Sequence, residues 1–237
     1  MVHEPLASSF GALVEGVGLA ALDAAGFRQL YALWQRQHLL VLRGHGLDRE
    51  GFQAFAARFG QVDPLPDLGA AETTWGVELA WAERPPFACL LHARNAPEEG
   101  GATWFACLPA ALRVIAPDLV ARLRWLAIRH GPNVHPMVIM QPETGEHSLF
   151  LGTRRDSRIM DVPVAESERL LNIAWSYGTA DAVSLCHHWQ RGDIVLWNNL
   201  TVMHRHDAVP AGSARKLQRV RIHGRYTLAA PIQQEAA

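Results

Sequence analysis

The chain has 237 residues, a formal net charge of −1 and a hydrophobic fraction of 49%. This length and composition suit one globular domain with a sizeable core, and we expect residues 1–237 to form it. The near-neutral charge provides no basic field for nucleic acid or anionic lipid. No apolar run approaches the roughly 18 residues that cross a bilayer. Nucleic-acid and membrane partners are therefore not expected, and a small-molecule substrate is.

The cysteines and the N-terminus predict a cytoplasmic location. Cys89, Cys107 and Cys186 are scattered and odd in number, which is typical of buried free thiols in a reducing compartment. The first residues lack a positive region followed by an apolar stretch, so we expect no signal peptide.

The first sixty residues predict an α/β cap. Apolar side chains recur at helical spacing in residues 24–37, and the apolar run 39–42 predicts a buried strand. Asp48 is a predicted N-cap of a helix that ends at Gly60. Residues 61–72 contain two prolines and a glycine, so we expect a loop there.

The remainder predicts mainly strands. A helix with one apolar face is expected at 109–128, and a second helix at 164–180. Strands are expected at 87–94, 103–107, 137–139, 148–151, 194–197 and 217–222, with a turn at 98–101. Many short strands with few helices favour a mainly β fold, a double-sheet jelly roll with an α/β cap and flanking helices.

Two C-terminal clusters and one upstream segment carry the candidate chemistry. The run 192–199 is followed by His204, and Arg215 is followed by Arg219. A histidine followed by two spaced arginines suits a metal with a dicarboxylate beside it, because a guanidinium pairs with a carboxylate through two parallel hydrogen bonds. Upstream, Gly76 and Glu78 stand two residues apart.

These segments resemble the taurine dioxygenase / 2,4-dichlorophenoxyacetate dioxygenase (TauD/TfdA-like) family of Fe(II)- and 2-oxoglutarate-dependent oxygenases. The resemblance covers nearly the whole chain and implies the double-stranded β-helix fold. It is carried by the order and spacing of the segments 10–17, 39–44, 55–60, 91–94, 97–103, 135–136, 142–145 and 189–197, together with the clusters above.

The resemblance implies a metal site at Gly76, Glu78 and His204. In the family, two histidines and a carboxylate hold the iron on one face of an octahedron. The first histidine and the carboxylate are two residues apart on a strand end, where side chains project to the same side. Glu78 and His204 are thus the implied ligands, and Gly76 marks a divergent member that lacks the first histidine. The alternative for His204 is a hydrogen-bonded strand histidine.

The resemblance also implies a site for the co-substrate. Thr103 and Arg215 match the pair that binds the distal carboxylate of 2-oxoglutarate. Arg219, four residues further along a predicted strand, matches the arginine that reaches the anionic group of the substrate or the metal end of the pocket. The alternative for both arginines is a solvated edge strand.

Other histidines are weighed as substitutes for the missing ligand. His92 lies on the strand after Glu78, and His206 shares the strand of His204. His187 and His188 precede a turn and are expected to be structural. None is preferred, because isolated histidines more often form hydrogen bonds than bind metal.

Two shortened loops and three tryptophans bear on the substrate. The segments 61–75 and 130–135 are shorter than their family counterparts, whose loops fold over the iron and exclude water. A more open site suits a large or carrier-bound substrate, or no oxidation. For Trp75, Trp81 and Trp104 we favour the core over an aromatic wall for an apolar substrate.

Three functions remain open. The first is an active dioxygenase with Fe(II) and 2-oxoglutarate. The second is a degenerate family member that binds a ligand without redox chemistry. The third is a non-redox reaction with Glu78 and His204 as acid and base. Substrate identity is not readable, and a homo-oligomer remains an open expectation from the resemblance.

Overall fold

The computed structural model describes residues 2–6, 10–44, 46–68, 73–97, 99–210, 212 and 215–228. In this part of the chain, the largest sheet has 7 strands in the order β1-β2-β3-β13-β5-β15-β4, and a 3-stranded sheet has the order β12-β6-β14. The other two sheets have the orders β11-β7-β8 and β10-β9. The strands are β1 Val2–Pro5, β2 Ala12–Glu15, β3 Leu39–Arg43, β4 Val62–Leu68, β5 Ala88–Asn95, β6 Thr103–Cys107, β7 Ala127–His130, β8 Asn133–Pro136, β9 Val138–Met140, β10 His147–Leu149, β11 Ser157–Ile159, β12 Ser184–His187, β13 Ile194–Asn198, β14 Val202–His206 and β15 Lys216–Ile222.

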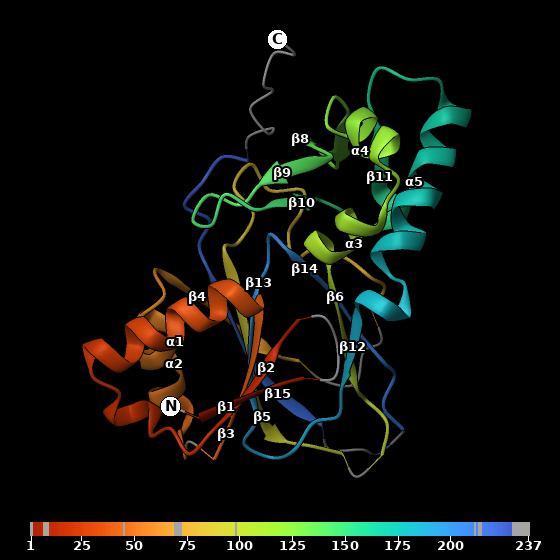
Figure 1. The fold of residues 1–237 in the computed structure, drawn as a ribbon. Helices are drawn as coiled ribbons and strands as arrows, with labels where there is room; N and C mark the ends of the chain where they lie inside the picture. Colours follow the sequence, from red (N-terminus) through yellow and green to blue (C-terminus); the bar gives the residue numbers. More distant parts are fainter. Residues whose placement is uncertain are drawn as a thin grey trace.

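The chain alternates between the two main sheets. It passes from β5 in the large sheet to β6 in the small one, and later from β13 to β14 and back to β15. Among the strands described, all pairs are antiparallel except β2 with β3. This arrangement confirms the predicted jelly roll, and it places β14 and β15 in different sheets (Figure 1).

Helices cover the outside of the sheets. The helices α1 and α2 pack against strands of the large sheet, whereas α3 and α5 contact β10 and β11 (Figure 1). Asp48 caps α2 by accepting a hydrogen bond from the Gly51 N–H at 2.7 Å, as predicted. The helix bounds are α1 Ala24–Gln37, α2 Arg49–Ala57, α3 Leu108–Val114, α4 Pro117–Leu123 and α5 Val164–Gly178.

The predicted helix at 109–128 is wrong. The chain forms α3 and α4 instead, with Ile115 and Ala116 extended between them at ψ of 142° and 136°. Pro117 explains the break, because a proline disfavours helical backbone at the preceding residue and lacks an N–H. Residues Ala127–His130 then form β7.

The predicted loop at 61–72 is also wrong for most of its length. Residues Val62–Leu68 form β4, which pairs with β15 at one edge of the large sheet. The two prolines are tolerated there because an edge strand has one side without ladder partners. Residues 69–72, like Glu98 in the predicted turn, lie outside the described residues.

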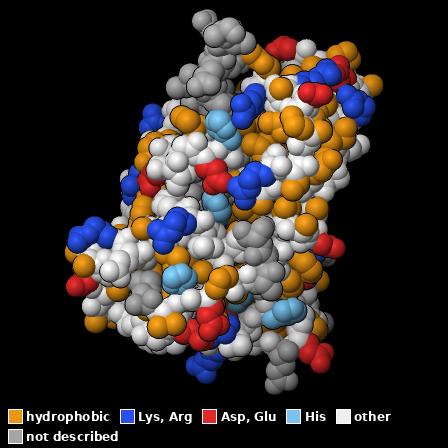
Figure 2. Space-filling view, viewed as in Figure 1, with side chains coloured by type: hydrophobic (Ala, Val, Ile, Leu, Met, Phe, Trp, Pro, Cys, Tyr) orange, Lys and Arg blue, Asp and Glu red, His pale blue; other side chains and the backbone are white. Residues whose placement is uncertain are grey.

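One hydrophobic cluster fills the space between the layers. The rings of Trp34, Phe59 and Phe87 pack edge to face between α1, α2 and the large sheet. Cys89 and Cys107 are buried and free, but Cys186 is partly exposed, which corrects the expectation that all three are buried. No helix within the described ranges is long and apolar enough to span a bilayer. On the face in Figure 2, acidic and basic side chains are interspersed among hydrophobic ones.

Candidate active site

Strand register brings His204, His206 and Thr103 together. Residues two apart on a strand face the same side, so His204 and His206 project from β14 together, with ring centroids 5.3 Å apart. In the antiparallel pair of β14 with β6, His206 stands directly opposite Thr103. Cross-strand partners are close enough for their side chains to interact.

Gly76 is held directly beside His204 by its backbone alone. The Gly76 N–H donates to the His204 carbonyl at 3.1 Å, and the His204 N–H donates back at 3.0 Å. A Cβ at Gly76 would lie 3.4 Å from Thr153 Oγ1, which is ordinary van der Waals contact. The backbone position is therefore defined and has room for a Cβ, but the glycine supplies no side chain.

Glu78 is positioned by Asn199 and paired with Arg221. The Asn199 amide accepts from the Glu78 N–H and donates to the Glu78 carbonyl, both at 2.9 Å. Leu79 then turns the chain with φ of 49°, a conformation uncommon outside glycine. The Glu78 Oε1 accepts from Arg221 at 3.2 Å, and Arg221 also holds Asp63 at 2.8 Å. One oxygen of Glu78 is thus engaged in an ion pair.

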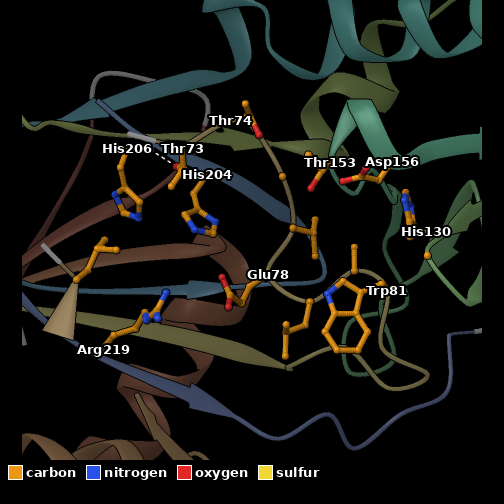
Figure 3. Close-up of a pocket in the computed structure, with 16 residues that line it drawn as sticks. Thr73, Thr74, Glu78, Trp81, His130, Thr153, Asp156, His204, His206 and Arg219 are labelled. Atoms are coloured by element: carbon orange, nitrogen blue, oxygen red, sulfur yellow. Dashed lines mark hydrogen bonds between the residues drawn. The ribbon is translucent and has the colours of Figure 1, made fainter. Parts of the chain in front are cut away.

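A cavity of about 430 Å³ joins these groups (Figure 3). Of the five predicted site residues, Glu78, His204 and Arg219 line it, whereas Thr103 and Arg215 are not among its lining residues. The lining residues are Leu68, Thr73, Thr74, Gly76, Val77, Glu78, Leu79, Ala80, Trp81, His130, Gly131, Thr153, Asp156, His204, His206 and Arg219.

Arg219 brings a partly buried guanidinium to the cavity. It projects from β15 towards Glu78 (Figure 3), and its buried Nε has no hydrogen-bond partner among the described residues. A buried charged donor left unpaired is costly. This makes Arg219 a candidate contact for an anionic ligand.

His204 also carries an unsatisfied buried atom. Its Nδ1 has no hydrogen-bond partner within the described ranges. Burial lowers the pKa of His204, and the nearby Glu78 carboxylate opposes that effect. The imidazole is therefore held neutral, which is the form that binds a metal ion.

Thr103 is already engaged. Its hydroxyl lies 2.8 Å from His206 Nδ1 and accepts a hydrogen bond of 2.8 Å from Trp189 Nε1. Burial, with further contributions from His204, Arg215 and Arg219, lowers the pKa of His206 to about 2. The His206 ring, rather than Thr103, reaches the cavity.

Arg215 is buried behind the cavity. Its side chain donates to the Gly101 carbonyl at 2.9 Å, and the residue is 4% exposed. Burial lowers its pKa. The alternative of a solvated edge strand is therefore wrong for Arg215.

The opposite end of the cavity is built around His130. Its Nε2 accepts from the Gly152 N–H at 3.3 Å, and its Nδ1 lies 3.0 Å from Ser157 Oγ. Burial, and then the neighbouring His135, lower the pKa of His130 to about 4. A Cβ at Gly152 would lie 2.5 Å from His130 Nδ1, so this close approach requires glycine.

The tryptophans do not behave alike. Trp81 lines the cavity and is 53% exposed, so the preference for a core position is wrong for this residue. Trp75 and Trp104 are partly buried, and the Arg205 guanidinium lies 5.5 and 5.0 Å from the centroids of their rings. These are cation–π contacts of residues outside the cavity lining.

The described residues do not provide a metal site with three side-chain ligands. Glu78 and His204 both line the cavity. Among the described residues, no group of three or more His, Cys, Asp or Glu side chains could hold a metal ion. His92, His187 and His188 are not among the lining residues, so none of them supplies the missing ligand.

Three relevant residues were not predicted as site residues. His206 was weighed only as a substitute ligand, although its spacing from His204 on one strand already placed it on the same face. Arg221 stands two residues after Arg219 and shares its face for the same reason. Asn199 gave no signal beyond its place before His204, because its contacts are with the backbone of a segment 121 positions away.

The chain is similar to known proteins over nearly its full length. The family model described as Taurine catabolism dioxygenase TauD, TfdA family matches residues 3–221. The (S)-phenoxypropionate/alpha-ketoglutarate-dioxygenase of Sphingobium herbicidovorans is 30% identical, over 85% of this chain and 87% of that protein. The alpha-ketoglutarate-dependent 2,4-dichlorophenoxyacetate dioxygenase of Cupriavidus pinatubonensis is 24% identical, over 92% and 96%. A solved taurine dioxygenase from Burkholderia xenovorans has a TM-score of 0.88 at 25% identity, over 97% of this chain and 91% of that one.

Proposed function

Because the chain belongs to the TauD, TfdA family of dioxygenases, we propose that it is a 2-oxoglutarate-dependent non-haem iron oxygenase acting on a small anionic organic substrate. The observation that carries the proposal is the convergence of Glu78, His204 and Arg219 on one cavity. A carboxylate, a neutral imidazole and an unpaired guanidinium together suit a metal ion with an anion beside it.

Glu78 and His204 are the residues that would hold the iron. When bound, iron with 2-oxoglutarate and O2 would supply the oxidation. One oxygen atom of O2 would enter the succinate formed together with CO2 from 2-oxoglutarate, and the other would go to the substrate. Asn199 fixes the backbone of Glu78, and Arg221 orients its carboxylate through Oε1. These contacts hold one ligand in place before any metal arrives.

Arg219 is the proposed anchor for an anionic group. Arg219 lines the cavity, and its buried Nε has no hydrogen-bond partner in the described part of the chain. The apolar wall of Val77, Leu79 and Trp81 would contact the rest of the ligand. A substrate on a carrier, a homo-oligomer and a cytoplasmic location stay predictions.

A second candidate function is favoured by two observations. Gly76 leaves the metal site one ligand short, and the Thr103 hydroxyl is occupied by His206 and Trp189. Both suit a family member that binds an organic anion without redox chemistry. In that case Glu78 and His204, which line the cavity together, could serve as an acid–base pair.

Anaerobic titration with Fe(II) and 2-oxoglutarate separates the two functions. For the wild type we expect the weak visible charge-transfer band of the chelate, saturating at one equivalent of iron. His204→Ala should lose the band, because one of two protein ligands is gone. His188→Ala, a matched change at an exposed histidine outside the cavity lining, should keep it.

Gly76→His provides the decisive comparison. It restores a side chain where the structure leaves room for a Cβ, so it should tighten iron binding. If Gly76→His shows the band and the wild type does not, the proposed oxidation is wrong and the second function stands. Succinate production coupled to substrate loss would then be absent from the natural protein.

A further inference from the structure

The hydrogen-bond pattern behind His206 fixes which of its nitrogens carries a proton. Trp189 Nε1 is only a donor, so the Thr103 oxygen accepts its hydrogen bond of 2.8 Å. The single Thr103 hydroxyl proton then needs an acceptor, and His206 Nδ1 lies 2.8 Å away. In the neutral ring Nδ1 therefore accepts, and the proton sits on Nε2.

This result does not depend on the charge of the ring. A doubly protonated imidazole also carries a proton on Nε2, and only the opposite neutral tautomer would remove it. That tautomer would leave the Thr103 hydroxyl proton without an acceptor among the described residues. Trp189, Thr103 and His206 thus form a chain of two hydrogen bonds, in which Trp189 donates to Thr103 and Thr103 donates to His206.

Two hydrogen bonds with Thr73 fix the backbone of His206. The His206 N–H donates to Thr73 Oγ1 at 2.8 Å, and the Thr73 N–H donates to the His206 carbonyl at 3.0 Å (Figure 3). His206 is 3% exposed, yet it lines the cavity together with Arg219. Within the described ranges, the hydrogen bonds of His206 are made by its Nδ1 and its backbone, and none involves Nε2.

We propose that His206 is a ligand-binding residue, whose Nε2–H is held as a fixed hydrogen-bond donor to a carboxylate bound beside Arg219. A donor and a guanidinium that converge on one oxyanion stabilise it more than either does alone. Thr103 acts one step further back, as the group that orients the imidazole. The carboxylate ligand rests on the proposed function, whereas the tautomer does not.

The first test reads the tautomer directly. Long-range proton–nitrogen NMR spectra of histidine labelled with nitrogen-15 distinguish a protonated ring nitrogen from a bare one. In the wild type, the His206 signals, identified by their loss in His206→Phe, should show a bare Nδ1 and a protonated Nε2. Thr103→Val should weaken this preference, and Thr103→Ser should keep it. A protonated Nδ1 with a bare Nε2 in the wild type overturns the proposal.

The second test measures carboxylate binding without metal, so that it is separate from the iron titration. Succinate and propionate are titrated calorimetrically into chelator-treated protein. His206→Phe keeps the ring volume but removes the donor, and should weaken binding by about tenfold or more, as expected for a hydrogen bond to a charged group. His188→Phe, the same change at an exposed histidine outside the cavity lining, should bind as the wild type does.

The two acids identify the source of the carboxylate. If only succinate binding depends on His206, the carboxylate is that of the dicarboxylate co-substrate. If both depend on it, the donor serves any organic acid, including the substrate. Wild-type affinity in a folded His206→Phe variant, or no saturable binding of either acid to the wild type, contradicts the proposal.

Discussion

At the scale of single residues, the cavity is shaped by which polar groups are already satisfied. The Thr103 hydroxyl and the Glu78 Oε1 form hydrogen bonds within the protein, whereas Arg219 and His204 each carry a buried nitrogen with no hydrogen-bond partner among the residues described. Because unsatisfied buried donors are costly, they indicate where a ligand gains the most. His130 is the opposite case, since both of its nitrogens have neighbours.

His130 should make stability depend on pH. Its folded pKa of about 4 lies below its ordinary value of 6.5, so the unfolded chain binds more protons between these two values. The stabilisation is therefore complete above pH 6.5 and is lost as pH falls towards 4. The loss amounts to roughly 3 kcal/mol in the free energy of unfolding.

Urea unfolding at several pH values checks this. His130→Gln should flatten the decline between pH 6.5 and 4, while other buried histidines continue to contribute. His188→Gln, at an exposed position, should follow the wild type. Equal slopes for His130→Gln and the wild type would show that His130 is not held neutral.

At the scale of elements, the break between α3 and α4 differs from the single helix predicted at 109–128. The two consecutive extended residues Ile115 and Ala116 interrupt it. Ile115 is buried, and so is Leu123 on α4. Both belong to the hydrophobic core, so burial of Ile115, together with Pro117, favours the break between the two helices.

Pro117→Ala should consequently leave α3 and α4 separate. We expect unchanged helical circular dichroism and a loss of about 0.4–1 kcal/mol in unfolding free energy, because the unfolded chain becomes more flexible. Pro109→Ala, at the first turn of α3, is the matched control with no preceding helix to join. A gain in helical signal for Pro117→Ala alone would mean that the proline by itself keeps the helices apart.

The elements that could be predicted carry local signals. Helix α1 follows from apolar spacing, and α2 from its Asp48 cap. Strand β4 could not be predicted, because its two prolines are typical of loops and its pairing with β15 joins distant segments. In the site, residues two apart on one strand were predictable. The hydrogen bonds from Trp189 to Thr103 and between Asn199 and the Glu78 backbone join distant segments. No local sequence pattern indicates such contacts.

At the scale of the whole molecule, Glu143 links three distant segments. It accepts hydrogen bonds from Tyr31 at 2.5 Å and Gln35 at 2.9 Å, both on α1, and from Tyr226 at 3.0 Å, beyond β15. Burial, and then the hydrogen bond to Glu143, raise the pKa of Tyr31. The segment after β15 is thus tied to the first helix through one carboxylate.

Removing this carboxylate should loosen that end of the fold. Glu143→Ala is expected to lower the unfolding free energy by about 1–2 kcal/mol, because partly exposed hydrogen bonds contribute modestly. Hydrogen–deuterium exchange should accelerate in residues 223–228. Glu83→Ala, at an exposed position, should change neither quantity. Unaltered exchange near Tyr226 in Glu143→Ala would show that other contacts hold the segment.

The backbone pairing of Gly76 has a consequence for how this chain can change over generations. Position 76 is tied to His204 through its peptide group alone, and a Cβ there meets its neighbours at ordinary distances. This pairing involves peptide groups only, so replacing the glycine would leave the strand contact itself in place. The set of side-chain ligands could therefore change over generations separately from the backbone contact that positions them.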